Sequence, residues 1–93
     1  MKKTVVVRNP MGLHARPASV FVKIANQYDA DVHVAKDGQS VNGKSIMGIL
    51  MLAAEQGSEV SMETTGPEAA AAMEALEAFL TSVDASSEAG GLV

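Results

Sequence analysis

The chain has 93 residues, a formal net charge of −4 and no cysteine, which excludes disulfide bridges and thiolate chemistry and disfavours nucleic acid as a ligand. The apolar run nearest its start is three valines at 5–7, too short for a signal peptide or a membrane span. We therefore expect a single cytoplasmic domain that does not insert into a membrane and is a monomer.

The first third of the chain predicts a strand followed by a helix. The β-branched run KTVVVR favours a strand over residues 2–8, which the turn signal Asn9-Pro10 ends. Pro17 then falls in the first turn of a helix over 15–27, where its missing N–H costs nothing. The apolar positions of this helix recur at helical spacing, at Ala18, Phe21, Val22, Ala25 and Tyr28.

The middle of the chain predicts a hairpin and then a short helix. ADVHVAK alternates between apolar and polar residues, and the DG pair that follows favours a tight turn. Strands at 31–36 and 40–42 should therefore pair antiparallel. Ser45 suits the N-cap of a helix and Gly57 suits the residue after its end, which predicts a helix over 46–55.

The last third predicts a fourth strand and a longer helix. SEVSMETT alternates, which favours a strand over 59–65, and Pro67 suits the first position of the helix that follows. The segment DASSEAGGLV loses all periodicity, so we expect one domain over residues 1–84 and a flexible tail over 85–93. The apolar stripe of the last helix comprises Ala69, Ala72, Met73, Leu76, Phe79, Leu80 and Val83.

The predicted order of elements is therefore βαββαβα. A hairpin combined with helical crossovers predicts an α+β fold, an open-faced β-sandwich in which three helices cover one face of a four-stranded, mainly antiparallel sheet. His33 alternates with two valines and is expected on the solvent face of that sheet, without a function. No cysteine or second histidine lies near it, and we expect neither a metal site nor a cofactor.

The stretch GLHARPA at 12–18 contains the clearest candidate chemistry. His14 directly precedes a predicted helix, so its ring lies near backbone N–H groups without partners and near the positive end of the helix dipole. That field favours the neutral, nucleophilic ring, and the same N–H groups suit a phosphoryl group. Arg16 adds a planar charged fork that reaches phosphate oxygens. Gly12 permits a tight turn and Pro17 stiffens the helix start.

These parts fit phosphoryl transfer that is shared with a partner protein docked over His14, because such transfer depends mainly on positioning and charge stabilisation. The chain contains no P-loop motif and no second nucleophile motif, which favours a carrier over an enzyme. The competing interpretation is that His14 only caps the helix and Arg16 is a solvated residue. Neither residue alone decides between the two.

Three motifs, in this order and at this spacing, resemble the histidine-containing phosphocarrier (HPr) family of the bacterial phosphoenolpyruvate-dependent sugar phosphotransferase system (PTS). They are GLHARPA at 12–18, KSIMGI at 44–49 and TTGPEA at 64–69, and the resemblance covers residues 2 to about 83. The resemblance implies the same open-faced sandwich that the order of elements predicts.

The resemblance also implies roles for the residues around His14. It implies that His14 accepts a phosphoryl group on Nδ1 from phosphorylated enzyme I and passes it to a histidine of an enzyme IIA domain. Arg16 would stabilise the phosphoryl group, and the phosphate-binding segment would comprise Ala15, Arg16 and Pro17, with the amides of Ala15 and Arg16 assisting.

Ser45 corresponds to the regulatory serine of the family, which an ATP-dependent HPr kinase/phosphorylase modifies in bacteria that possess one. A phosphate at a helix N-terminus favours the helix, yet it adds up to two negative charges beside a surface that partners must approach. The alternative is a plain N-cap hydroxyl worth ~1 kcal/mol. The surrounding KSIMGI motif favours the regulatory site.

The short predicted helix is too apolar for every side to be core. At 100° per residue, Ile46 and Leu50 lie on one side and Ile49 and Leu52 lie roughly opposite, so we expect one set to be exposed. The methionines of this helix either adapt an exposed surface to several partners or fill gaps in the core. The resemblance implies a partner-docking patch near His14 that comprises Ser19, Val20, Ile46, Met47 and Leu50.

Two other functions remain open. One is a regulatory paralogue, as in the nitrogen-related PTS branch, which passes phosphate to control proteins. The other is an HPr-like interaction module that docks on a transcriptional regulator, although the presence of His14 argues against a module that never holds phosphate on histidine. At the position of Met11 the family often has a small or hydroxyl residue. The methionine either widens the docking surface or is a variation of that surface without a further role.

Overall fold

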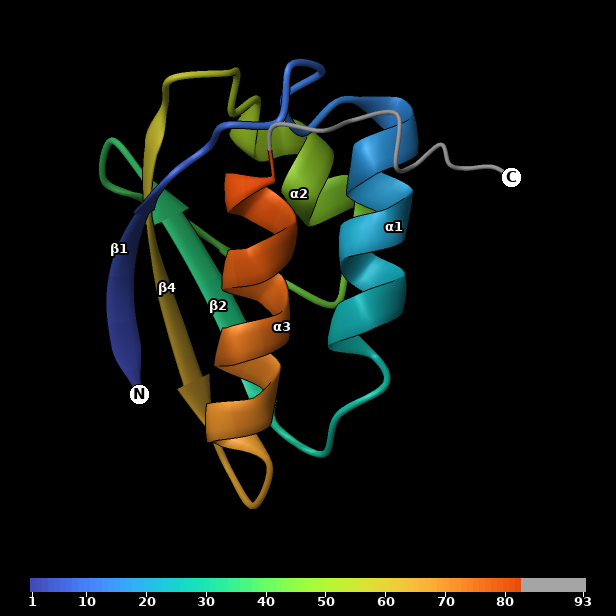
Figure 1. Cartoon of the computed structure of the whole chain (residues 1–93), viewed down its shortest axis with the longest axis vertical. Helices are drawn as coiled ribbons and strands as arrows, with labels where there is room; N and C mark the ends of the chain where they lie inside the picture. Colours follow the sequence, from blue (N-terminus) through green and yellow to red (C-terminus); the bar gives the residue numbers. More distant parts are fainter. Residues whose placement is uncertain (83–93) are drawn as a thin grey trace.

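The structure is a computed structural model, which describes residues 1–82 and has the predicted βαββαβα order (Figure 1). The strands are β1 (Lys2–Val6), β2 (Asp31–Lys36), β3 (Gln39–Asn42) and β4 (Glu59–Thr65). The helices are α1 (Ala15–Ala25), α2 (Ile46–Leu52) and α3 (Ala69–Thr81). The expected tail over 85–93 and the expected last stripe residue, Val83, lie outside the described residues.

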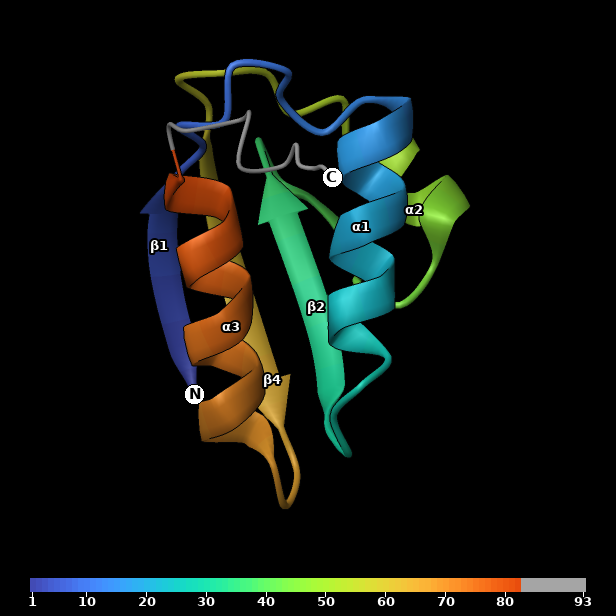
Figure 2. The same ribbon diagram turned by 45° about the vertical axis from the view of Figure 1, so that its right-hand side comes forward.

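The four strands form one sheet in the order β1-β4-β2-β3, and every neighbouring pair is antiparallel. Figures 1 and 2 show the helices layered on one face of this sheet, which confirms the open-faced α+β sandwich. Val34 lies opposite Met62 in the register of β2 and β4, and both are buried beneath the helices. His33, one position along, is exposed on the open face, as the alternation predicts.

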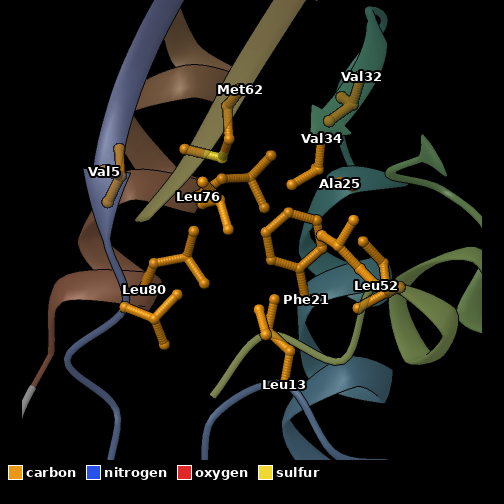
Figure 3. Packing of buried hydrophobic residues seen from close by; sticks show 14 of the residues in the cluster. Val5, Leu13, Phe21, Ala25, Val32, Val34, Leu52, Met62, Leu76 and Leu80 are labelled. Carbon is orange, nitrogen blue, oxygen red and sulfur yellow. The ribbon is translucent and has the colours of Figure 1, made fainter. Parts of the chain in front are cut away.

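The core lies between the sheet and the helices, as Figure 3 shows. Phe21 of α1 is fully buried in it, and its ring centroid lies 6.4 Å from that of Phe79 in a tilted arrangement. Leu76 and Leu80 of α3 are fully buried in the same cluster. Leu13 is also fully buried there, although it belongs to the loop before α1. The residue next to His14 is therefore anchored in the core.

Helix α2 ends at Leu52, three residues before the predicted end, and Gly57 is not its C-terminal glycine. Ala53 adopts the left-handed conformation with φ of +53° and ends the helix by itself. The chain then turns so that the Ala54 carbonyl accepts a hydrogen bond from the Leu13 N–H at 2.7 Å. The Ala54 carbonyl is therefore bonded to the loop before α1 and not to an N–H of a further turn of α2.

Helix α3 begins at Ala69 and not at Pro67. Glu68 is tied to the loop after α1, because its N–H donates to the Asp29 carbonyl at 3.0 Å and its Oε1 accepts the Asp29 N–H at 2.6 Å. Helical bonding therefore starts with the Ala72 N–H and the Glu68 carbonyl, at 2.9 Å. The predicted stripe is confirmed within the described residues, with its buried members at Ala72, Met73, Leu76 and Leu80 and its partly buried ones at Ala69 and Phe79.

The first strand and the first helix are also shorter than the sequence predicts. Strand β1 ends at Val6, although backbone bonds from the Val7 N–H to Ser58 at 2.8 Å and from the Gly57 N–H to Val7 at 2.7 Å continue its contact with the chain before β4. Helix α1 ends at Ala25, and the Asn26 side-chain amide donates to the Val22 carbonyl at 2.9 Å, which satisfies one of the last carbonyls.

Candidate functional site

His14 is the N-cap residue of α1, with an extended backbone at φ −85° and ψ −163°. Its side chain is exposed and forms no capping hydrogen bond. The ring therefore does not cap the helix through a hydrogen bond, because such a cap requires the side chain to accept an N–H of the first turn. The exposed side chain is therefore open to a reagent or a docked partner.

The first turn of α1 presents two backbone N–H groups beside His14. The first intrahelical bond runs from the Ala18 N–H to the His14 carbonyl at 2.7 Å, and Pro17 has no N–H. Within residues 1–82, no acceptor pairs with the N–H of Ala15 or of Arg16. These two donors lie at the positive end of the helix dipole, where a negatively charged group is favoured.

The Arg16 side chain is exposed on the same first turn, two residues after His14. Within the described part of the chain it belongs to no salt bridge, and the first turn of α1 contains no acidic residue. No carboxylate of residues 1–82 therefore neutralises the guanidinium. It can turn toward an anion at the helix start, where its fork matches two phosphate oxygens.

The loop before His14 is fixed by a short series of hydrogen bonds. The buried Asn9 accepts twice, through its side-chain oxygen from the Met11 N–H and through its carbonyl from the Gly12 N–H, both at 2.9 Å. The Leu13 N–H then donates to Ala54 beyond α2. Because Leu13 is also buried, the backbone that leads into His14 is held from two sides.

Gly12 is required by both its conformation and its surroundings. Its φ is +63°, and a Cβ at this position would lie 2.8 Å from the Ala54 carbonyl oxygen and 2.9 Å from the Glu55 Cα. Both neighbours are backbone atoms, so neither can swing aside as a side-chain end can. The sequence predicts the tight turn at Gly12, whereas the close approach to the chain after α2 is visible only in the fold.

Helix α2 separates its buried and exposed residues as the helical wheel predicts. Ile49 and Leu52 are fully or nearly fully buried, whereas Ile46 and Leu50 on the other side are exposed. The alternative that the methionines of this helix fill gaps in the core is wrong, because Met47 is among the exposed large hydrophobic residues and so is Met51. Exposed Ser19 and Val20 of α1 complete the set expected in the docking patch, which comprises Ser19, Val20, Ile46, Met47 and Leu50.

Ser45 is the N-cap of α2, and its Oγ accepts the Gly48 N–H at 3.1 Å. The other end of α2 is the one near His14, because Ala54 just beyond it bonds Leu13. At the Ser45 end, the Lys44 Nζ donates instead to the Tyr28 carbonyl beyond α1, at 3.0 Å. Ser45 and His14 thus lie toward opposite ends of the surface that α1 and α2 share.

Of three residues that position His14, Asn9 and Ala54 lie outside the sequence motifs, and Leu13 lies inside GLHARPA without its burial being predicted. Asn9, Leu13 and Ala54 act through burial or through bonds between distant segments. In the sequence Asn9 indicates only a turn, and Ala54 is an alanine in an apolar run with no local sign of its role. The one signal in the sequence is the hydrophobic Leu13 beside a predicted helix start.

Within residues 1–82, no helix is long and apolar enough to cross a membrane. The same residues contain no group of three or more histidine or carboxylate side chains that would surround a metal ion. A polar hollow lies at the hairpin end of the sheet, lined by residues that include Thr4, Lys36 and Glu59. None of the predicted site residues lines this hollow.

Comparison with known proteins agrees with this arrangement. The family model PTS-HPr, described as "PTS HPr component phosphorylation site", matches residues 1–82. The phosphocarrier protein HPr of Neisseria meningitidis is 45% identical over 76 residues, which cover 82% of this chain and 85% of that protein.

Two solved structures are also similar. The crystal structure of phosphocarrier protein HPr from Bacillus anthracis has a TM-score of 0.84 and 48% identity, covering 86% of this chain and 95% of that one. Crh of Bacillus subtilis, named a catabolite repression protein, has a TM-score of 0.73 and 44% identity, covering 85% and 91%, and was solved as a domain-swapped dimer. The family match and these identities over most of each chain show that the protein belongs to the HPr family of phosphocarriers of the phosphotransferase system.

Proposed function

We propose that His14 accepts a phosphoryl group on Nδ1 from phosphorylated enzyme I and donates it to a histidine of an enzyme IIA domain. As an HPr family member, the chain is a phosphocarrier and not an enzyme. One observation supports this assignment most strongly: an exposed, uncapped imidazole stands beside two backbone N–H groups without acceptors in residues 1–82. That combination joins a nucleophile to a binding site for the group it receives.

In the proposed transfer, the neutral Nδ1 forms a bond to phosphorus while the bond from phosphorus to enzyme I breaks. The transition state is loose, and negative charge is spread over the three equatorial oxygens. The N–H groups of Ala15 and Arg16 would donate to these oxygens, and the Arg16 guanidinium would add a full positive charge. Pro17 fixes the backbone of the first turn, so these donors need little reorganisation.

The direct test is transfer from labelled phosphoenolpyruvate in the presence of enzyme I and magnesium, followed by addition of an enzyme IIA domain. We expect label that is stable in base, labile in acid, and lost from this protein as the IIA domain gains it. Acid-stable label, or label that never leaves for the IIA domain, would contradict the proposed role.

Replacing Arg16 with alanine is expected to slow transfer to His14 about 10- to 100-fold, since removing one charged donor from a transition state has effects of this order or larger in enclosed sites. Arg16→Lys keeps the positive charge but lacks the planar fork, so its transfer rate should lie between those of the wild type and Arg16→Ala. Lys23→Ala removes an equally exposed cation from the last turn of the same helix and should transfer normally. Single-turnover rates that are equal for Arg16→Ala and Lys23→Ala would remove Arg16 from the mechanism.

We infer that the docking patch receives enzyme I and enzyme IIA alike. Four of its five residues are exposed hydrophobic side chains on α1 and α2, and an exposed apolar patch is typical of protein interfaces. HPr kinase/phosphorylase and a transcriptional regulator would use the Ser45 end of the same surface. Because these partners share one surface, a phosphate on Ser45 would affect docking of enzyme I and enzyme IIA, and so phosphoryl transfer, without contacting His14.

Ser45→Ala is expected to prevent acid-stable labelling by ATP and the kinase, and to lower the free energy of unfolding by about 1 kcal/mol through loss of the N-cap bond. Ser40→Ala is the matched control, because Ser40 is exposed on β3, is not an N-cap and lies outside the docking patch. Labelling is read by autoradiography and stability by urea titration. Undiminished acid-stable label in Ser45→Ala would place the modification elsewhere.

One second candidate is an HPr-like module that docks on a transcriptional regulator, and the similarity to Crh, named a catabolite repression protein, favours it. A regulatory paralogue of the nitrogen-related branch would share the same His14 chemistry. Binding to the regulator that requires phosphorylated Ser45 and is unaffected by His14→Ala would favour the Crh-like function. Transfer to a sugar-specific IIA domain favours the carrier.

We also propose that the protein acts in the cytoplasm, where enzyme I is found, and as a monomer. In a monomer, β1 pairs with β4 of the same chain, as the register of Lys2–Val6 with Glu59–Glu63 describes. A Crh-like exchange of strands between two copies is the alternative. Light scattering at several concentrations distinguishes them, since only the dimer gives twice the mass of the chain.

A further inference from the structure

The six methionines of the chain divide sharply by exposure. Met62 and Met73 are buried in the core, with at most 1% of their surface accessible. The other four are exposed by more than half, at 59% for Met1, 54% for Met11, 68% for Met47 and 63% for Met51. Large apolar side chains exposed to this extent are accessible to solutes as well as to partners.

Three of the four exposed methionines lie on the loop before His14 or on α2, which contributes to the docking patch. Met47 and Met51 are four residues apart, so they share the solvent-facing side of α2 that contributes to the docking patch. Met11 is three residues before His14, on a backbone held by Asn9. Met1 lies at the opposite end of the molecule, where its amino group donates to the Thr64 carbonyl (Figure 1).

We propose that Met11, Met47 and Met51 form an oxidant-sensitive site, whose conversion to methionine sulfoxide by peroxides weakens docking of phosphotransferase partners. This inference rests on the proposed function, because it assumes that partners dock on this surface. It goes beyond that function by assigning a modification, a reagent class and a consequence to residues that take no part in phosphoryl chemistry.

The oxidation balances with the peroxide alone. The thioether sulfur attacks one peroxide oxygen, a sulfur–oxygen bond forms as the oxygen–oxygen bond breaks, and water leaves. Sulfur is oxidised by two electrons and the peroxide is reduced by two, and methionine sulfoxide reductases reverse the change. The product is polar where the thioether was apolar, so it disfavours burial against a partner.

The fold should tolerate this change because the three sulfur-bearing side chains are exposed before docking. Loss of favourable apolar burial at three positions is expected to weaken binding of enzyme I about tenfold or more. His14 and the donors beside it are unchanged. The apparent KM for this protein should therefore rise while kcat remains nearly constant.

The test treats the whole protein with hydrogen peroxide and follows each methionine by peptide mass spectrometry. Binding of enzyme I is measured by calorimetry and transfer by steady-state kinetics, before and after oxidation and again after sulfoxide reductase. We expect Met1, Met11, Met47 and Met51 to oxidise ahead of Met62 and Met73, binding to fall about tenfold, and reductase to restore it. The thermal unfolding midpoint should not change.

The matched variant is Met11→Leu/Met47→Leu/Met51→Leu, which keeps apolar volume, removes the three sulfurs and retains oxidisable Met1. Whatever its own starting affinity, that affinity should be the same before and after peroxide. An equal fall in the variant, slow oxidation of the three methionines, or unchanged binding by oxidised protein would overturn the proposal. Normal binding without any His14 labelling would instead overturn the proposed function, so the two failures are distinguishable.

Discussion

Replacing His14 with alanine is expected to abolish acid-labile labelling from phosphoenolpyruvate and enzyme I, because no other residue combines an exposed imidazole with the amides of Ala15 and Arg16. The chain has two histidines, and His33 lies on the open face of the sheet, across the core from the helices. Labelling is measured by gel autoradiography after alkaline and acid treatment. The loss should be complete within detection.

The matched control is His33→Ala, which removes the other imidazole and should label at the normal rate. Both histidines are exposed and His14 makes no side-chain capping bond, so neither variant should unfold. Circular dichroism melts check this. Residual acid-labile label in His14→Ala that disappears in the double variant would move the phosphorylation site to His33.

Gly12→Ala is expected to lower the free energy of unfolding by about 2–5 kcal/mol, the second large effect. A non-glycine residue in the left-handed region costs roughly 1–2 kcal/mol, and forcing a methyl group against the backbone of Ala54 and Glu55 adds about 1–3 kcal/mol. If the loop shifts to relieve this clash, His14 shifts with it and transfer slows. Urea titration and single-turnover labelling measure the two consequences.

Gly38→Ala provides a control for backbone strain alone. Gly38 in the β2–β3 turn has φ of +83°, but a Cβ at this position would have no neighbour within 4 Å. This variant should lose only about 1 kcal/mol and should transfer phosphate normally. Equal losses of stability in the two variants would show that the close approach of Gly12 to the chain after α2 contributes nothing.

Most of the fold could be predicted because its elements have strong local signals. The alternation in ADVHVAK and SEVSMETT predicts strands whose buried residues, such as Val34 and Met62, do face the helices. The stripe that includes Met73 and Leu76 likewise predicts the buried side of α3. The spacing of apolar residues is sufficient to predict an element when one of its faces packs on the core and the other faces solvent.

The errors occur where bonds between distant segments override local preference. The sequence favours Gly57 as the end of α2, yet Ala53 ends it earlier, and the next residue bonds Leu13 forty-one positions away. The sequence likewise favours Pro67 as the start of α3, yet Glu68 is first tied to Asp29. Local sequence patterns cannot predict these bonds, because the bonded residues come together only after the helices have packed.

The candidate site divides in the same way. His14 and Arg16 follow from helix-end physics and from the motif, and the structure brings both to the first turn of α1. The wheel of α2 predicts two apolar sides, but only packing against the core decides that Ile49 is buried and Met47 is exposed. The residues that fix the loop, Asn9 and Ala54, act through tertiary contacts and leave no sequence motif.

The most direct test of the phosphocarrier mechanism is to locate the phosphoryl group on the wild-type protein. The chain is labelled through enzyme I, kept at alkaline pH, and analysed by tandem mass spectrometry together with nitrogen-15 NMR of the imidazoles. We expect one phosphoryl group, on Nδ1 of His14, with His33 and Ser45 unmodified. A phosphoryl group on any other residue, or on Nε2 of His14, would contradict the mechanism.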